Sequence, residues 1–137
     1  MITGLNHLTL AVSDLERSVV FYSELLDFSV RMRRPTSAYL DVGTLWLALV
    51  LDSTVRCGPL PEYSHVAFSV SPTDLPHLAE RLRLAGVTCW QQSEDSTSFY
   101  FLDPDGHKLE LHCGDLQSRL LARAAKNGRA LNLSDAN

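Results

Sequence analysis

The sequence predicts an α+β domain in which two tandem βαβββ modules form a cupped mixed sheet. A nine-residue motif occurs twice, as LNHLTLAVS from residue 5 and as YSHVAFSVS from residue 63. Each copy is followed by apolar residues at helical spacing and then by three stretches with strand character. At 137 residues the chain has the size of one domain, so we expect the modules, 1–51 and 63–112, to share a core.

The first module is expected to begin with a buried strand at the first copy of the motif. Ser13 and Glu16 have the spacing of a capping box, which predicts a helix that starts there and runs to Leu26. Strands are expected after it at 28–33, 38–42 and 44–51. Residues 52–62, rich in glycine and proline, form the expected linker to the second module.

The second module repeats this order. Ser71 and Pro72 suit the start of a helix, and Gly86 suits its end. Strands are expected at 87–91, 98–102 and 107–112, and the sequence DPDG from residue 103 predicts a tight turn before the last of them. An amphipathic helix over 113–126 is expected to follow, and residues 127–137 form a tail.

One face of the sheet carries the candidate functional residues. Side chains alternate across a strand, so the bulky residues of each strand face the helices and the others face the hollow of the sheet. By this parity His7, His65 and Glu110 share the hollow. Two neutral imidazoles and one carboxylate bind a divalent metal and leave coordination positions open. The same face is predicted to carry Thr9, Tyr39, Trp46, Ser98 and Tyr100.

Structural explanations of the same residue types stay open at this point. A buried histidine is commonly a hydrogen-bonded core residue, and Glu110 between two leucines needs either a partner cation or a metal. We expect His112 to support Glu110, and His77 and His107 to lie at the surface. Solvated positions on a strand edge or a helix stripe are expected for Arg31, Arg33, Arg34, Arg119, Arg123 and Lys126.

Charge and composition argue against nucleic-acid and membrane partners. Sixteen acidic and twelve basic residues give a net charge of −4, which is unfavourable for neutralising phosphates. The sequence has no apolar run long enough to span a bilayer and no cationic leader before a hydrophobic block, so a cytoplasmic protein is expected. Cys57, Cys89 and Cys113 have no disulfide or CxxC spacing and are expected to be reduced thiols.

The repeat carries a family resemblance. GLNHLTLAVSDLERSVVFY near the start and SFYFLDPDGHKLELH near the end, with AYL, VG and LW between them, resemble the vicinal oxygen chelate superfamily of glyoxalases and bleomycin-resistance proteins. Within that superfamily the sequence is most similar to the fosfomycin-resistance glutathione transferases of the FosA type. The resemblance covers about residues 1–125.

This resemblance implies the glyoxalase/bleomycin-resistance fold and a homodimer in which modules of two chains pair. It implies that Mn(II) is bound by His7 of one chain and by His65 and Glu110 of the other. The implied substrates are fosfomycin, a small epoxide phosphonate, and glutathione, whose thiolate attacks an epoxide carbon. The resemblance therefore predicts a metal-dependent transferase that confers antibiotic resistance.

The resemblance also assigns roles to other residues. Thr9 matches the residue that hydrogen-bonds the oxirane oxygen, and Trp46 matches a position on the thiol side of the pocket. Tyr39 lies on that side too and is expected to deprotonate or orient the thiol. The positions that contact the phosphonate are matched by Ser98, Tyr100 and Arg119.

The sequence departs from the family pattern at the phosphonate and potassium sites. Gln91 replaces a lysine that holds the phosphonate, and the loop 93–97 is one residue shorter and lacks a glycine. We therefore expect weaker phosphonate binding, with Arg33 or Arg34 as candidate replacements for the lost cation. The altered loop counts against activation by K⁺, and another small oxyanion or epoxide stays open as the substrate.

Other functions remain alternatives to the transferase. On fold alone the protein could be an epoxide hydrolase, a glyoxalase or a dioxygenase-like metalloenzyme. Hydrolysis needs a carboxylate base near the stretch 37–39, which contains none. A non-enzymatic protein that sequesters a drug, of the bleomycin-binding type, would have no use for three metal ligands.

Overall fold

A computed structural model describes residues 1–127 of the chain, so nearly all of the expected tail, 128–137, lies outside the described residues. The described elements in chain order are β1 (Leu8–Val12), α1 (Leu15–Val20), the π-helical turn η1 (Phe21–Leu25), β2 (Ser29–Arg33), β3 (Ser37–Val42), β4 (Leu45–Leu51), β5 (Val66–Ser69), α2 (Leu75–Leu84), β6 (Ser98–Leu102), β7 (Lys108–His112) and α3 (Leu116–Lys126).

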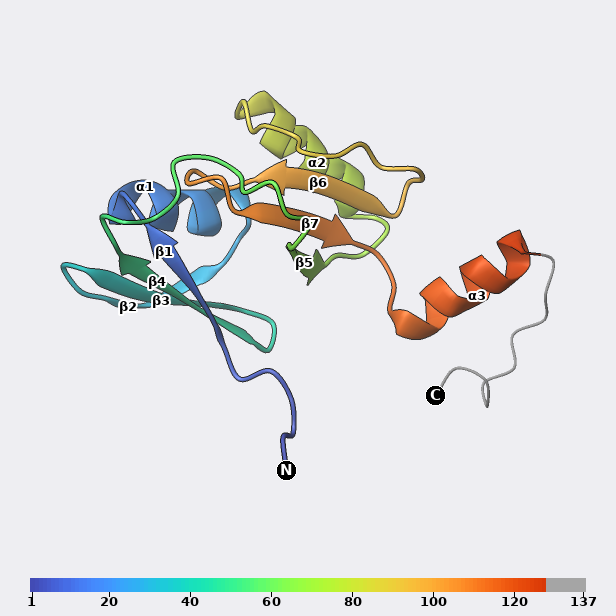
Figure 1. Ribbon diagram of the computed structural model, residues 1–137, viewed down its shortest axis with the longest axis horizontal. Helices are drawn as coiled ribbons and strands as arrows, with labels where there is room; N and C mark the ends of the chain where they lie inside the picture. Colours follow the sequence, from blue (N-terminus) through green and yellow to red (C-terminus); the bar gives the residue numbers. More distant parts are fainter. Residues whose placement is uncertain (128–137) are drawn as a thin grey trace.

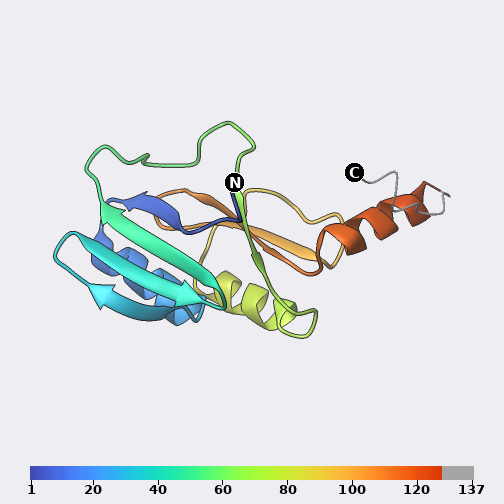
Figure 2. The ribbon, with the colours of Figure 1, turned by 90° about the horizontal axis from the view of Figure 1, so that it is seen from below.

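The strands form two mixed sheets that repeat one topology, as the α+β prediction requires. The first sheet has the order β1-β4-β3-β2 and the second the order β5-β7-β6. In each sheet the motif strand is parallel to the last strand of its module, and the remaining pairs are antiparallel. Figure 1 shows α3 extending away from both sheets, and Figure 2 shows the same after a quarter turn.

The predicted strand at 87–91 is wrong. Residues 87–91 run beside β6, but they make only one backbone bond to it, from Leu102 N to the Thr88 carbonyl, and one isolated bridge between Gln91 and Tyr100. The amide of Val87 is used to close the end of α2 on the Leu82 carbonyl. Because this amide bonds to the end of α2, it is not available for a regular series of backbone hydrogen bonds to β6.

Both helices start later than the sequence predicted. Asp14, not Ser13, caps α1, and its carboxylate accepts the Arg17 amide at 3.0 Å. The helix α2 begins at Leu75, after a turn in which the Ser71 hydroxyl accepts the Asp74 amide. The first helix is α-helical only to Val20 and continues as the π-helical η1. None of the helices within the described residues is long and apolar enough to cross a membrane.

One hydrophobic core extends through both modules. Its fully buried members come from the first module and the second alike, among them Tyr22, Leu40, Leu47, Leu82, Phe101 and Leu109. Helix α1 packs against β3 and β4, and α2 packs against β6 and η1. Because the helices cover one face of the sheets, the functional side chains occupy the opposite face.

Buried and half-buried polar contacts also join the modules, through the turn that precedes β7. Tyr22 donates its hydroxyl to Asp103 Oδ2 at 2.8 Å, and Ser13 donates its hydroxyl to Asp105 Oδ1 at 2.5 Å. His107 Nε2 lies 2.7 Å from the Ala11 carbonyl, and the residue is 6% exposed, so its predicted place at the surface is wrong. We call these three residues of the turn and their partners the 103–107 clamp.

Candidate active site

Glu110 is the centre of a polar cluster on the open face of the second sheet. In the strand register it lies opposite Ala67 on one side and Tyr100 on the other. Its carboxylate is buried, with the residue 6% exposed. Oε1 lies 3.0 Å from His65 Nε2, and Oε2 accepts the Ser98 hydroxyl at 2.7 Å. Strand alternation therefore brings His65, Glu110 and Ser98 together, as the sequence predicted.

His112 extends this cluster by one register position. Its Nδ1 lies 3.2 Å from Glu110 Oε2 and 2.8 Å from the Ser98 hydroxyl oxygen. The hydroxyl donates to the carboxylate, so it can accept a hydrogen bond from an Nδ1–H of His112. This contact holds the Glu110 carboxylate in place, which is the supporting role expected for His112.

The tautomer of His65 shows that its pair with Glu110 suits a cation. Nδ1 lies 2.9 Å from the Tyr63 carbonyl oxygen, and only an Nδ1–H can make that hydrogen bond. In a neutral ring Nε2 then presents a lone pair to a carboxylate oxygen 3.0 Å away. Two acceptors face each other at that distance only with a proton or a metal ion between them. His65 and Glu110 thus fit as two ligands of a divalent metal.

A second group of predicted residues lies on the first sheet. Thr9 of β1 and Tyr39 of β3 both pair with Ala48 of β4, so they occupy one row across the sheet. The His7 ring stacks on Trp46 with ring centroids 4.4 Å apart, and Tyr39 meets Trp46 edge-on at 5.1 Å. All except Ala48 are exposed.

The described chain holds these groups apart. His7 precedes β1 on the first sheet, whereas His65 and Glu110 belong to the second. Within residues 1–127 no group of three His, Cys, Asp or Glu side chains is placed to hold a metal ion. A single chain therefore presents two of the three predicted ligands together and the third elsewhere.

A cavity of about 750 Å³ lies beside the Glu110 cluster. Ser98 and Tyr100 form part of its wall, and the half-buried Arg119 enters it from α3. Burial raises the pKa of Tyr100, so its phenol stays protonated and available as a donor at neutral pH. Three residues predicted to contact a phosphonate therefore share one cavity.

The same cavity contains Gln91, which the family resemblance places at the phosphonate site, and a second arginine that the sequence analysis did not assign to a site. The side-chain amide of Gln91 donates to the Tyr63 hydroxyl at 2.9 Å, so the residue that replaces a lysine holds a neighbouring phenol. Arg123 also lines the cavity. Its spacing of four residues from Arg119 is the sequence signal that could have indicated this.

The two arginines proposed as replacements for the lost lysine lie elsewhere. Arg33 NH2 bonds to Glu16 Oε2 at 2.7 Å, which ties it to α1 on the first module. Neither Arg33 nor Arg34 lines the cavity that contains Gln91. Within a single chain, neither arginine therefore reaches the side of the cavity that contains Gln91.

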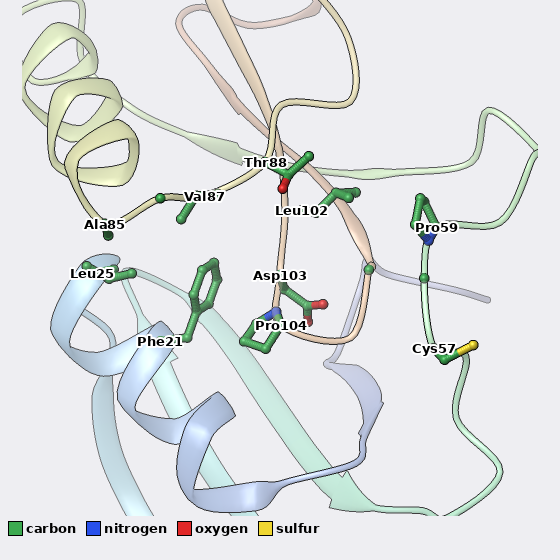
Figure 3. A pocket seen from close by; sticks show the side chains of 13 residues that line it. Phe21, Leu25, Cys57, Pro59, Ala85, Val87, Thr88, Leu102, Asp103 and Pro104 are labelled. Carbon is green, nitrogen blue, oxygen red and sulfur yellow. The ribbon is translucent and has the colours of Figure 1, made fainter.

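Another cavity, of about 430 Å³, lies at the junction of the modules and is remote from this chemistry (Figure 3). Phe21 and Leu25 of η1, Val87 after α2 and Pro104 of the clamp turn form its largely apolar wall. None of the predicted site residues lines it. The candidate active site is therefore the face that carries Glu110.

The comparison with protein families identifies the fold that carries this site. The family model described as "Glyoxalase/Bleomycin resistance protein/Dioxygenase superfamily" matches residues 4–111. The chain belongs to this superfamily. The match spans both motif copies and ends one residue after Glu110, so the three predicted metal ligands lie within the matched domain.

Relatives within the superfamily are similar over most of the chain. Glutathione transferase FosA of Serratia marcescens is 52% identical over 125 residues, which cover 89% of each chain. Metallothiol transferase FosB of Staphylococcus haemolyticus is 37% identical over 125 residues, covering 88% of this chain and 90% of the relative. A crystal structure of a variant of the fosfomycin resistance protein FosX from Listeria monocytogenes, complexed with Mn(II) and 1S,2S-dihydroxypropylphosphonic acid, aligns with a TM-score of 0.74. It is 26% identical, covering 88% of this chain and 98% of that one.

Proposed function

We propose that the protein is a metal-dependent glutathione transferase that opens the epoxide of fosfomycin and so confers fosfomycin resistance. The observation that carries the proposal is the buried Glu110 carboxylate facing His65 Nε2 at 3.0 Å, beside a cavity that Arg119 enters. The 52% identity to a glutathione transferase FosA supports the choice of thiol and substrate.

The proposal includes a homodimer that completes the metal site. His7 of one copy joins His65 and Glu110 of the other, because the described chain keeps these residues on different sheets. The open face of the first sheet exposes Tyr39 and Trp46, each more than one third accessible. A second copy that covers this face buries the aromatic rings and brings Thr9 to the cavity.

The metal is proposed to be Mn(II), held by the two histidines and the carboxylate. A FosX structure that aligns with this chain contains Mn(II), which supports the choice. When bound, such an ion acts as a Lewis acid towards the oxygen of the opening epoxide. Ser98 and His112 fix the Glu110 carboxylate for this purpose through its Oε2.

The other residues act on the two substrates. Arg119 and Tyr100 bind the phosphonate, Ser98 lines the cavity beside it with its hydroxyl donated to Glu110, and Thr9 donates a hydrogen bond to the oxirane oxygen. Tyr39 orients or deprotonates the thiol of glutathione, and Trp46 forms the wall against which the thiol lies. The thiolate forms a C–S bond at an epoxide carbon, the C–O bond breaks, and the alkoxide takes up a proton.

Potassium is not part of the proposal. In the loop 93–97 the Ser93 hydroxyl is bound to the Asp95 carbonyl, and the Asp95 carboxylate accepts the Thr97 amide at 2.9 Å. Oxygen atoms that could coordinate K⁺ therefore take part in hydrogen bonds within the loop instead. A cytoplasmic location is part of the proposal, because glutathione is the thiol of that compartment.

The proposal is tested by incubating the protein with Mn(II), glutathione and fosfomycin and analysing the products by mass spectrometry. We expect the glutathione adduct, its loss on chelation of the metal, and a rate at least about 100-fold lower for Glu110→Gln, which removes a charged ligand. Glu24→Gln is the matched control, since Glu24 is exposed on η1 and lies outside both the metal site and the cavity.

Other products would contradict the transferase. Formation of the diol from fosfomycin without a thiol would show that water is the nucleophile. Unchanged fosfomycin that remains bound to the protein would show sequestration. An adduct yield equal to that of the chelated control would overturn the proposal as well.

A further inference from the structure

Two guanidinium groups enter the cavity beside Glu110 from the same helix. Arg119 and Arg123 are four residues apart on α3, so they project from one side of it. Both line the cavity of about 750 Å³, opposite the polar groups of Gln91, Ser98 and Tyr100. Within residues 1–127 neither arginine has a carboxylate partner within ion-pair distance.

The second guanidinium balances the negative charges in the lining of the cavity. The acidic residues Glu94 and Asp95 belong to the same wall. The hydrogen bonds from Thr97 lower the pKa of Asp95, and the nearby Arg119 lowers it further, so this carboxyl is ionised at neutral pH. With Arg119 alone the lining would carry a net negative charge. Arg123 brings it to neutrality before the ligand binds.

Other cations of the second module are already engaged. Lys108 Nζ donates to the Glu62 carbonyl at 2.6 Å and lies over the Trp90 ring at 5.1 Å. Arg83 lies over the Phe99 ring at 5.1 Å. Neither lines the cavity that contains Arg119 and Arg123, although Arg83 lines a neighbouring cavity that shares Gln91 with it.

We infer that Arg123 is a specificity-determining residue, which acts with Arg119 to select ligands that carry a doubly charged phosphonate or phosphate. The inference rests on the proposed function and specifies which group of the substrate this cavity recognises. A guanidinium on a flexible side chain at the cavity rim reaches the outer oxygens of such a group, while Arg119 binds it from deeper in the cavity.

The inference is tested with Arg123→Gln and with inorganic phosphate as the probe, measured by isothermal titration calorimetry. Lys126→Gln is the matched control, because it removes one positive charge from the same helix but does not line the cavity. We expect Arg123→Gln to weaken phosphate binding about three- to tenfold relative to the control. Arg123→Lys should recover part of the affinity, which separates charge from helix stability.

Steady-state kinetics with fosfomycin give the second readout. Arg123→Gln should raise the KM for fosfomycin by a similar factor and leave kcat close to that of Lys126→Gln, because binding and not bond breaking is affected. Equal phosphate affinity and equal KM in the two variants would overturn the inference. Phosphate binding that depends on Arg123 in a protein that forms no adduct would instead reject the transferase and keep the anion site.

Discussion

Tyr22 and Asp103 form the most deeply buried polar contact of the clamp. Tyr22 is inaccessible to solvent, and burial followed by the nearby Asp103 charge raises its pKa, so the phenol is a donor at every physiological pH. Asp103 also accepts the amides of Asp105 and His107, each at 2.9 Å. One carboxylate thus receives three donors, one of which comes from the other module.

Replacing Tyr22 with phenylalanine tests how much this contact stabilises the fold. The ring still fills its place in the core, but a buried carboxylate loses a hydrogen bond, so we expect the free energy of unfolding to fall by about 1.5–3 kcal/mol. Urea denaturation measures the change. Tyr63→Phe, at a tyrosine that is 60% exposed, is the control and should unfold like the wild type. A double-mutant cycle with Asp103→Asn that shows additive effects would contradict the coupling.

Sequence parity placed single residues well where strands were regular. Glu110 and Ser98 lie on one face of adjacent strands, as their positions predicted. His107 was misplaced because nothing in a turn sequence reveals that its imidazole reaches the Ala11 carbonyl, 96 residues away in sequence. Arg123 was read as a solvated helix residue because a helix pattern alone does not show that a cavity lies beside it.

At the scale of elements, α3 depends on its own cap. None of its residues is buried within the described chain, so packing contributes little to its stability. The Asp115 carboxylate accepts the Ser118 amide at 2.9 Å, and the Ser118 hydroxyl oxygen accepts the Asp115 amide at 2.8 Å. This capping box fixes the start of the helix that carries Arg119 and Arg123.

The cap makes the stability of α3 depend on pH. The Ser118 amide lowers the pKa of Asp115 below its ordinary value of 3.8, so the ionised carboxylate stabilises the helix. The stabilisation is complete above pH 3.8 and is lost as the pH falls through the lowered pKa. Hydrogen exchange of the Ser118 amide between pH 5 and 2, corrected for the intrinsic exchange rate, should show this loss of protection.

Asp115→Asn is the control for this titration. Asparagine caps helices without ionising, so protection of Ser118 in this variant should change little with pH. Asp115→Ala should leave the amide weakly protected throughout. If the asparagine variant lost protection over the same range as the wild type, another group would control the helix.

Element prediction succeeded where hydrophobic periodicity was strong and failed where side chains compete for the backbone. The repeat located β1, β5 and both of their helices, because alternating and helical patterns are local. The segment 87–91 has the composition of a strand, yet its first residue closes the end of α2. The Trp90 indole donates to the Leu109 carbonyl at 3.0 Å and so holds the segment against β7. Such attachments depend on tertiary structure.

For the whole molecule, the proposed pairing of modules from two copies makes a quantitative prediction. His7→Ala and Glu110→Gln variants should each be inactive as homodimers. When the two are unfolded together in equal amounts and refolded, half of the dimers are mixed, and each mixed dimer contains one intact site. Activity per chain should therefore recover to about one quarter of the wild-type value.

This experiment separates a shared site from a site within one chain. A site made by a single chain cannot be restored by mixing, because every chain then lacks a ligand. A mixture of His65→Ala and Glu110→Gln is the control, since both residues belong to the same half of the site and no mixed dimer is intact. Recovery in the control, or none in the first mixture, would contradict the shared site.

The 103–107 clamp has a consequence for how the chain folds during its synthesis. The polar groups of Ser13 and Tyr22 are made early, but their partners are not available until the turn before β7 has been translated. At ribosomal rates of 5–20 residues per second, the interval between residues 22 and 107 is roughly 4–17 s. Throughout that interval the nascent first module lacks the acceptor for the Tyr22 hydroxyl, which is buried in the finished protein. Completion of its fold therefore waits for the second module, and the two halves of this duplicated chain fold as one cooperative unit.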